Sequence, residues 1–332
     1  MNDAALWAWF LFDSGLPTQR AKALLDAWHA QSLTLQAALA RLPGDAAALR
    51  LAPAEAARLS PPDALPELQA LTWDAALYPM GLNRLPVKLR PALLYYRGEP
   101  TLLSRPIITL APGSLDQGPQ DHLREVINLL LGEELLLAGY EGSDQATLLM
   151  EEMAYSQGEI LLFANAGLKA RDPSSSESRL LGDGRMLVLS PLPPTAIHRP
   201  VWDSILTQVA LAASDRVILS GGQAQQPHTV AGLGSTPTLA LSGTPPDVRV
   251  PANIQVTDTP ADVLLWVESL FPEHELGGRA GQTTTDYVSA HDLPEDDLGP
   301  APSTKEILTT LGKGGTIPEA LRRRLEGDAR RI

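Results

Sequence analysis

Residues 107–110 read Ile-Ile-Thr-Leu, and residues 160–163 read Ile-Leu-Leu-Phe. Four similar apolar runs lie at residues 135–138, 186–189, 217–219 and 238–241. Stretches with helical patterning separate the runs, at residues 120–133, 143–156, 200–213 and 261–271. Short strands that are apolar throughout, rather than alternating, are typical of a parallel sheet with helices on both faces. The sequence therefore predicts an α/β fold, with a Rossmann-like, mostly parallel sheet and flanking helices over residues 73–271.

A small helical domain is expected before the sheet, over residues 1–72. Ala and Leu dominate this part, Pro and Gly divide it into short helices, and it shows no strand signal. Thr18 is the expected N-cap of a helix over residues 19–30. Residues 4–12 are apolar, but they follow Asp3 without basic residues and are too few to span a bilayer. We therefore expect an amphipathic first helix, no membrane contact and a cytoplasmic protein.

The C-terminal part lacks an apolar period. Residues 272–303 are acidic and interrupted by Pro and Gly, which predicts a linker. Residues 304–332 carry seven Lys or Arg against four Asp or Glu, so their net charge is +3. We expect a short basic helical tail here, with Arg322, Arg323 and Arg324 facing solvent or a partner, because burying these charges is costly. A solvated tail and a contact with a nucleic acid or an acidic partner are both open.

Composition excludes several classes of protein. The chain has 332 residues, enough for roughly two domains, and no cysteine, which excludes disulfides, thiolate metal sites and a cysteine nucleophile. Its six histidines are scattered, so no metal site is expected. The net charge of −13 argues against nucleic-acid or membrane binding driven by overall charge, although a local basic groove is still open. Gly-x-Ser-x-Gly, His-Glu-x-x-His and Gly-Lys-Ser/Thr motifs are absent, so we expect neither an enzyme nor a cofactor.

Glycine-containing loops follow three of the predicted strands. Ligands of parallel sheets bind at the carboxyl ends of the strands, where bare backbone amides and helix N-termini favour phosphate groups. The candidate residues in these loops are Gly113, Ser114, Gly139, Gly142, Ser220, Gly221 and Gly222. A tight turn without a ligand explains each glycine equally well. Either Ser143 or Asp144 is expected to cap the helix that follows Gly142.

Several motifs follow one another in a characteristic order. Tyr78-Pro79 precedes Pro91-Ala92-Leu93-Leu94-Tyr95-Tyr96-Arg97-Gly98. Next come Pro112-Gly113-Ser114, Gly139-Tyr140-Glu141-Gly142-Ser143-Asp144, Leu189-Ser190-Pro191-Leu192-Pro193-Pro194, Leu239-Ala240-Leu241-Ser242-Gly243 and residues 253–266. This series resembles the DNA-processing protein A family (DprA, also called Smf), which has Tyr-Pro…Pro-x-x-Leu-Tyr-x-Arg-Gly and Ser-Gly-x-x-x-Gly-Ile-Asp segments. The resemblance spans about residues 1–271.

The resemblance implies a Rossmann-like DprA-type domain preceded by a sterile-alpha-motif-like or helix-hairpin-helix-like domain. It also implies a protein without enzymatic activity that binds single-stranded DNA and loads a RecA-type recombinase during transformation. Arg199 joins the phosphate-binding candidates because it lies where the family has an Arg-Asn-Arg segment. Family members often carry a C-terminal winged-helix domain, and residues 304–332 are too few for a complete one.

The chain departs from the family pattern at basic positions. Leu115 stands where the family has an arginine after Gly-Ser, no histidine follows Asp144, and only Arg199 remains of Arg-Asn-Arg. Each lost phosphate contact weakens DNA binding. Two hypotheses follow: a DprA-like single-stranded DNA-binding protein that mediates recombination, and a nucleotide- or small-ligand-sensing module, or ligand-free scaffold, that has lost DNA binding. A recombinase partner and a homodimer are left open.

Overall fold

The computed structural model describes residues 3–57, 59, 61, 67–111, 115, 117–131, 133–153, 155–221, 236–241 and 254–270. The predicted linker over residues 272–303 and the predicted tail over residues 304–332 lie outside these ranges. The chain divides into two compact units, Met1–Pro260 and Ala261–Ile332. No described helix is long and apolar enough to cross a membrane.

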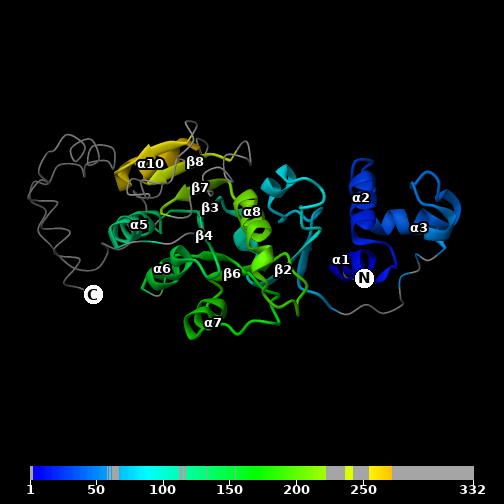
Figure 1. Cartoon of the computed structure of the whole chain (residues 1–332), viewed down its shortest axis with the longest axis horizontal. Coiled ribbons are helices and arrows are strands. Elements are labelled where there is room, and N and C mark those ends of the chain that lie inside the picture. The colour runs from blue at the N-terminus through cyan, green and yellow to red at the C-terminus, as the bar shows by residue number, and fades with distance from the viewer. Residues whose placement is uncertain are drawn as a thin grey trace, which may run out of the picture. The chain divides into compact units, whose positions relative to one another are not determined.

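The first unit is built on one mixed sheet, whose described strands follow the order β1-β2-β6-β5-β4-β3-β7-β8-β9 (Figure 1). The strands are β1 (Ala70–Thr72), β2 (Leu93–Gly98), β3 (Ile107–Leu110), β4 (Leu136–Tyr140), β5 (Ile160–Phe163), β6 (Met186–Ser190), β7 (Arg216–Leu219), β8 (Thr238–Leu241) and β9 (Gln255–Thr257). All neighbouring pairs from β6 to β9 are parallel, whereas β1 pairs with β2, and β2 with β6, in antiparallel fashion. This confirms the predicted Rossmann-like, mostly parallel sheet.

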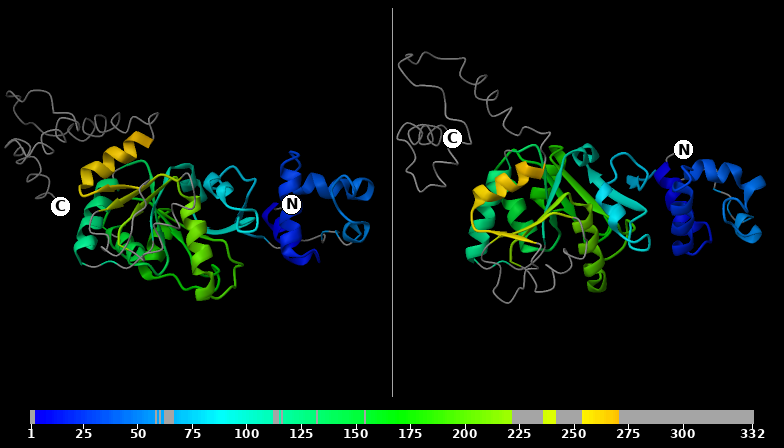
Figure 2. Two further views of the ribbon diagram at one scale, coloured as in Figure 1. Left: turned by 45° about the horizontal axis from the view of Figure 1, so that its top comes forward. Right: turned by 90° about the horizontal axis from the view of Figure 1, so that it is seen from above.

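Helices cover both faces of this sheet. The helices α5 (Gln117–Leu130), α6 (Asp144–Met153) and α7 (Ser175–Gly182) connect strands that step in one direction, from β3 to β6. After β6 the chain passes through α8 (Asp203–Ala213) and returns to β7, beside β3. Right-handed crossovers put helices on opposite faces when the stepping direction reverses. Figure 1 shows α8 across the sheet from α5, α6 and α7, and Figure 2 gives two further views of these layers.

The central strands are apolar because both of their faces are covered. Every residue of β3, β4, β5 and β6 is buried. Thr109, a polar residue in β3, shares a 2.5 Å hydrogen bond with Ser214 Oγ, which donates to Ala210 O in α8 at 2.8 Å. The polar groups between sheet and helix are therefore satisfied locally.

The N-terminal part is mostly helical, as predicted. It contains α1 (Asp3–Ala8), the π-helical turn η1 (Trp9–Asp13), α2 (Thr18–His29), α3 (Leu35–Asp45) and α4 (Pro53–Ala56). Two predictions here are wrong. Thr18 is not the N-cap of α2, because Pro17 holds that position and Thr18 Oγ1 donates to Leu11 O at 3.3 Å. A strand, β1, lies where none was expected, because its three residues are too few to produce a periodic pattern.

The N-terminal helices contact the antiparallel edge of the sheet. α1 packs against β1 and β2. Trp7 meets Trp73 edge to face, with ring centroids 5.5 Å apart. The Arg90 guanidinium lies 5.5 Å from the Trp73 centroid, and its Nη1 is 3.6 Å from Asp26 Oδ1. The helical part thus packs directly on the antiparallel end of the sheet.

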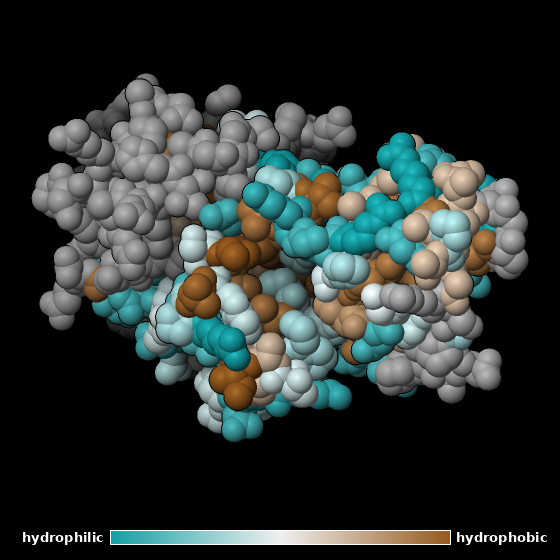
Figure 3. All heavy atoms as spheres, turned by 45° about the vertical axis from the view of Figure 1, so that its right-hand side comes forward, coloured by the Kyte–Doolittle hydropathy of each residue, from teal (hydrophilic) through white to brown (hydrophobic). Residues whose placement is uncertain are grey.

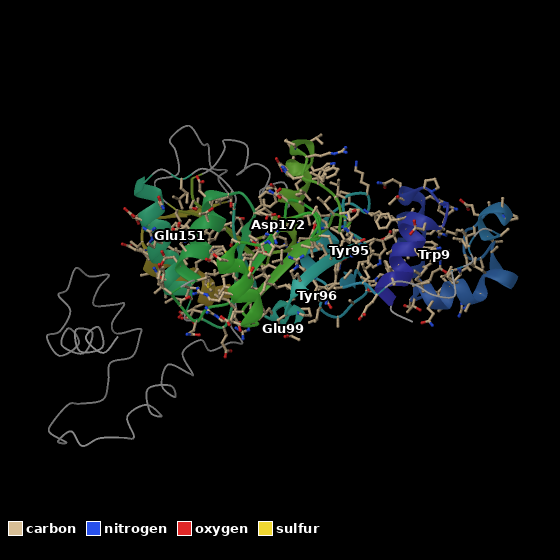
Figure 4. The ribbon with its side chains drawn as sticks, turned by 90° about the horizontal axis from the view of Figure 1, so that it is seen from below. Trp9, Tyr95, Tyr96, Glu99, Glu151 and Asp172 are labelled. Atoms are coloured by element: carbon tan, nitrogen blue, oxygen red, sulfur yellow. The ribbon has the colours of Figure 1, made fainter. Side chains whose placement is uncertain are left out.

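Tyr78, the tyrosine of the Tyr-Pro motif, has a structural role. Its side chain is buried, and its hydroxyl donates to Pro91 O at 2.5 Å, which joins the turn before η2 (Met80–Arg84) to the start of β2. On β2 itself, Tyr95 is buried and Tyr96 is half-buried (Figure 4). Burial raises the pKa of the Tyr78 phenol above its ordinary value and that of Tyr95 to about 12.

We expect alkaline pH to destabilise the fold through Tyr78 and Tyr95. Both phenols have a folded-state pKa above the unfolded value of about 10, so the unfolded chain loses these protons first. Their contribution to stability is therefore complete below pH ~10 and declines as the pH rises further. Urea unfolding at a series of pH values between about 8 and 11 measures this decline.

The variant Tyr78→Phe is the control for this pH dependence. At neutral pH it should be less stable by about 1–3 kcal/mol, because the buried Pro91 carbonyl loses its donor. Its stability should then fall less steeply above pH ~10 than that of the natural chain, because the Tyr78 phenol is gone. Equal slopes for the two proteins would show that Tyr78 does not contribute to alkaline destabilisation.

Candidate functional site

The loops at the carboxyl edge of the parallel strands meet around the start of α6. β4 ends at Tyr140, and a short turn leads directly into Asp144, the first residue of α6. The order of the strands reverses direction between β3 and β7. Open α/β sheets bind their ligands at such a switch point, outside the carboxyl ends of the strands. This edge is therefore the candidate site.

Packing and capping explain the small residues around the β4 turn. A Cβ atom at Gly139 would lie 2.9 Å from Ala146 Cβ, so the glycine allows α6 to approach β4 closely. Gly142 has a φ of +85°, which favours glycine. Ser143 Oγ accepts a hydrogen bond from Ala146 N at 3.1 Å and donates to Tyr140 O at 2.7 Å. Of the two predicted caps of α6, Ser143 therefore has this role. Phosphate binding at Gly139 and Gly142 stays a prediction.

The first two residues of α6 hold the neighbouring loops. Asp144 is exposed, and its Oδ2 accepts a hydrogen bond from Leu115 N, in the loop after β3, at 2.9 Å. Gln145 is fully buried, and its Nε2 donates to Ser220 O, in the loop after β7, at 2.7 Å. One helix end thus connects the loops that follow both strands of the switch point. Sequence reasoning did not find these contacts.

Ser220 and Gly221 form the described part of the loop after β7. Ser220 is 2% exposed, and its Oγ has no hydrogen-bond partner among the described residues. Gly221 has a φ of +65°, again in the region that favours glycine. The other candidates in these loops, Gly113, Ser114 and Gly222, lie outside the described residues. A ligand role for this loop is therefore still a prediction.

Arg171 forms an ion-pair network with Glu141, in the turn after β4, and with Glu177. Arg171 Nη2 lies 2.6 Å from Glu141 Oε1, and Arg171 Nη1 lies 2.5 Å from Glu177 Oε1. Asn165 N, in the loop after β5, donates to Glu141 Oε2 at 3.0 Å. Burial lowers the pKa of Arg171, but its hydrogen bonds to Glu177 and Glu141 outweigh burial and raise that pKa overall. Arg171 is thus a structural cation, and the exposed residue beside it, Asp172, is acidic (Figure 4).

Arg199 is the cation among the candidate residues, and it is exposed. Its guanidinium lies 5.4 Å from the ring centroid of Trp202, in the short helix η4 (Pro200–Trp202). Ile197 and Val201, on either side of Arg199 in the chain, are 75% and 76% exposed. Figure 3 shows that apolar side chains reach the surface at several places on one face of the molecule. Sequence reasoning missed Trp202, although an aromatic residue three positions after an arginine is a visible signal.

Asp203, the first residue of α8, brings two further side chains together. His198 Nε2 lies 2.8 Å from Asp203 Oδ1, and the Tyr140 hydroxyl donates to the same oxygen at 3.3 Å. Burial raises the pKa of the Tyr140 phenol, and the charge of Asp203 adds to this rise, so Tyr140 stays a donor. The cluster joins the end of β4 to the segment that carries Arg199. Sequence reasoning did not single out Tyr140 or Asp203 as site residues.

Other kinds of site have less support. Within the described ranges, no three His, Asp or Glu side chains are placed to hold a metal ion together. A cavity of about 110 Å³ is lined by residues that include Arg105, Leu135 and Glu159. These residues precede β3, β4 and β5, so the cavity lies at the amino edge of the sheet, away from the candidate site.

Comparison with known proteins identifies the fold. No protein-family model matches the chain, and no curated protein matches its sequence. Among solved structures, the chain is similar to DNA processing protein A (DprA) from Streptococcus pneumoniae, with 16% identity over 80% of this chain and 98% of that chain and a TM-score of 0.58. It is also similar to DNA processing protein A from Helicobacter pylori, with 13% identity over 61% of this chain and 97% of that chain and a TM-score of 0.50. The chain therefore has a DprA-like fold.

Proposed function

We propose that the chain is a DprA-like protein that binds single-stranded DNA at the carboxyl edge of its sheet and has no enzymatic activity. The observation that carries this proposal is the contact of the exposed Arg199 guanidinium with the half-buried ring of Trp202. A cation and an aromatic ring side by side can contact the backbone and a base of the same strand. The Helicobacter pylori structure, described as showing a single-stranded DNA binding mode, supports the proposal at the level of the fold.

In the proposed DNA contact, base stacking on Trp202 contributes more binding free energy than phosphate contacts do. The chain has a net charge of −13, and Arg171 is already neutralised by Glu141 and Glu177. Stacking of a base on an aromatic ring contributes about 1–3 kcal/mol and needs no surplus of positive charge. In this proposal the protein presents single-stranded DNA to a RecA-type recombinase during recombination or transformation.

Replacing Arg199 with glutamine should weaken binding of a fluorescein-labelled oligothymidylate to the full chain. The loss of one phosphate contact should also make the slope of log K against log salt shallower by about 0.7. Fluorescence anisotropy over a series of salt concentrations measures both quantities. The variant Trp202→Ala should lose affinity at every salt concentration with little change in slope, because stacking releases no counterions.

Arg179→Gln is the matched control, because it removes the same charge from an exposed position on α7. It should leave affinity and salt slope close to those of the natural chain. If Arg199→Gln behaves like this control, Arg199 is not part of a DNA site. Absence of binding by the natural chain at low salt would refute the proposed function itself.

A second candidate function is the recognition of a nucleotide or another small ligand at the same edge. The buried Ser220 Oγ favours it: this hydroxyl has no hydrogen-bond partner among the described residues, and such a group is a candidate for a hydrogen bond to a ligand. The exposed carboxylate of Asp144 is of the type that binds ribose hydroxyls in Rossmann folds. A melting temperature that rises with nucleotide but not with oligothymidylate would favour this candidate.

A further inference from the structure

Asp144 holds a backbone amide of the loop after β3. Its Oδ2 accepts the hydrogen bond of Leu115 N at 2.9 Å. Leu115 directly follows Gly113 and Ser114 and lies just before α5, which begins at Gln117. Amides between a strand and the helix that follows it are the donors that phosphate groups use in folds of this class. Asp144 Oδ2 therefore accepts the hydrogen bond that a phosphate oxygen of bound DNA would otherwise accept from Leu115 N.

Asp144 belongs to none of the ion pairs in the part of the chain that the structure describes. Its side chain is exposed, so its charge acts on molecules that approach from solvent. Leu115 itself occupies the position at which the family resemblance implies an arginine. The side chain of Leu115 carries no positive charge, and its backbone N–H already donates to Asp144. Neither group is therefore available to bind an anion.

The N-terminus of α6 does not need Asp144 as its cap. Ser143 Oγ already accepts the hydrogen bond from Ala146 N, at 3.1 Å. An acidic residue in the first turn is favourable for the helix dipole, but only by a few tenths to about 1 kcal/mol at an exposed position. The hydrogen bond that Leu115 N donates to Asp144 joins α6 to another loop, which capping alone does not explain.

We infer that Asp144 is an internal competitor of phosphate, which keeps the affinity of this edge for nucleic acid low. The inference rests on the proposed function, because it concerns the same site. The carboxylate acts in two ways: it occupies the Leu115 amide, and its charge repels an approaching phosphate. DNA bound at this edge is consequently held more by the stack of Arg199 and Trp202 than by the loop after β3.

The test compares variants of the full chain in their binding to a fluorescein-labelled oligothymidylate. Asp144→Asn removes the charge and keeps an oxygen that can accept from Leu115 N, whereas Asp144→Ala also frees the amide. Asp144→Asn should bind about fivefold more tightly than the natural chain, as expected for one charge removed at about 4 Å from a phosphate in watery surroundings. Asp144→Ala should bind at least as tightly as Asp144→Asn.

Asp183→Asn is the matched control for net charge. Asp183 is exposed and lies between α7 and β6, at the amino edge of the sheet. This variant should bind DNA as the natural chain does. The inference is supported if both Asp144 variants bind the oligothymidylate more tightly than the natural chain and Asp183→Asn does not. If neither Asp144 variant gains affinity, or if Asp183→Asn gains as much, the inference is wrong.

The outcomes separate this inference from the proposed function. If the natural chain binds DNA and the Asp144 variants bind it equally well, the proposed function stands and the inference fails. If the natural chain shows no binding and Asp144→Ala shows salt-dependent binding, the inference stands, and the natural chain is not a DNA-binding protein. Circular dichroism melting curves of all variants confirm that the comparisons are made between folded proteins.

Discussion

Replacing Arg171 with methionine is expected to lower the free energy of unfolding by about 3–5 kcal/mol, because it leaves the buried carboxylate of Glu177 and the half-buried one of Glu141 without their cation. The side chains of Arg171 and Glu177 are only 8% and 6% exposed, and that of Glu141 is 25% exposed. Methionine keeps much of the length and volume of the side chain, so the loss is mainly one of charge and hydrogen bonds. Urea unfolding monitored by circular dichroism measures the change.

Two further variants show whether burial causes the expected loss. Arg124 pairs with Glu152 at 2.7 Å, but its side chain is 38% exposed, so Arg124→Met should cost no more than about 1 kcal/mol. The double variant Arg171→Met, Glu177→Gln should recover part of the stability lost in Arg171→Met, because it removes one of the unpaired charges. Equal losses for Arg171→Met and Arg124→Met would contradict a special role of the buried network.

The network also affects the candidate site. Glu141 follows β4 directly, and it receives the hydrogen bond of Asn165 N from the loop after β5. Loss of Arg171 therefore releases both loops, and binding at this edge should weaken together with stability. A variant that loses stability but keeps its DNA affinity would show that the two loops do not shape the site.

The central sheet was predictable because each of its strands carries its own signal. β5 is apolar throughout, β3 is apolar except for Thr109, and β6 is apolar up to Ser190, as burial of both faces favours. The antiparallel edge was not predicted. β2 begins with Leu93-Leu94-Tyr95 and ends with Arg97-Gly98, a stretch that resembles a family motif but does not have the pattern of a buried strand. β1 is too short for a pattern.

The candidate site was predictable only as a set of loops. Glycine and serine at strand ends mark turns, and Gly142 and Gly221 indeed have positive φ values of +85° and +65°. The contacts that define the chemistry of these turns join residues far apart in the chain, such as Gln145 with Ser220 and Asp144 with Leu115. They depend on how neighbouring strands align, which local patterns do not report.

Replacing Gly98 with alanine is expected to destabilise the fold by more than about 4 kcal/mol. Single substitutions cause losses of this size only when they create severe steric overlap or a buried defect. Gly98 has a φ of +100°, a conformation that costs other residues about 1–2 kcal/mol. A Cβ atom here would also overlap with Met186 O, a backbone atom of β6, and lie 2.9 Å from Leu181 Cδ2. Since β2 pairs with β6 at this point, the methyl group fits only if the two strands separate.

Alanine variants of two other glycines separate the two causes of the expected effect of Gly98→Ala, which are backbone strain and steric overlap. Gly184 has a φ of +70°, but a Cβ atom there meets nothing within 4 Å, so Gly184→Ala should cost only the backbone strain of about 1–2 kcal/mol. Gly182, the last residue of α7, also has open space and no positive φ, and Gly182→Ala should be neutral or slightly stabilising. Thermal unfolding ranks the three variants, with a shift of about 10 °C expected for Gly98→Ala. If Gly98→Ala loses no more than Gly184→Ala, β2 and β6 accommodate the methyl group, and the close approach of their backbones is not what requires glycine at this position.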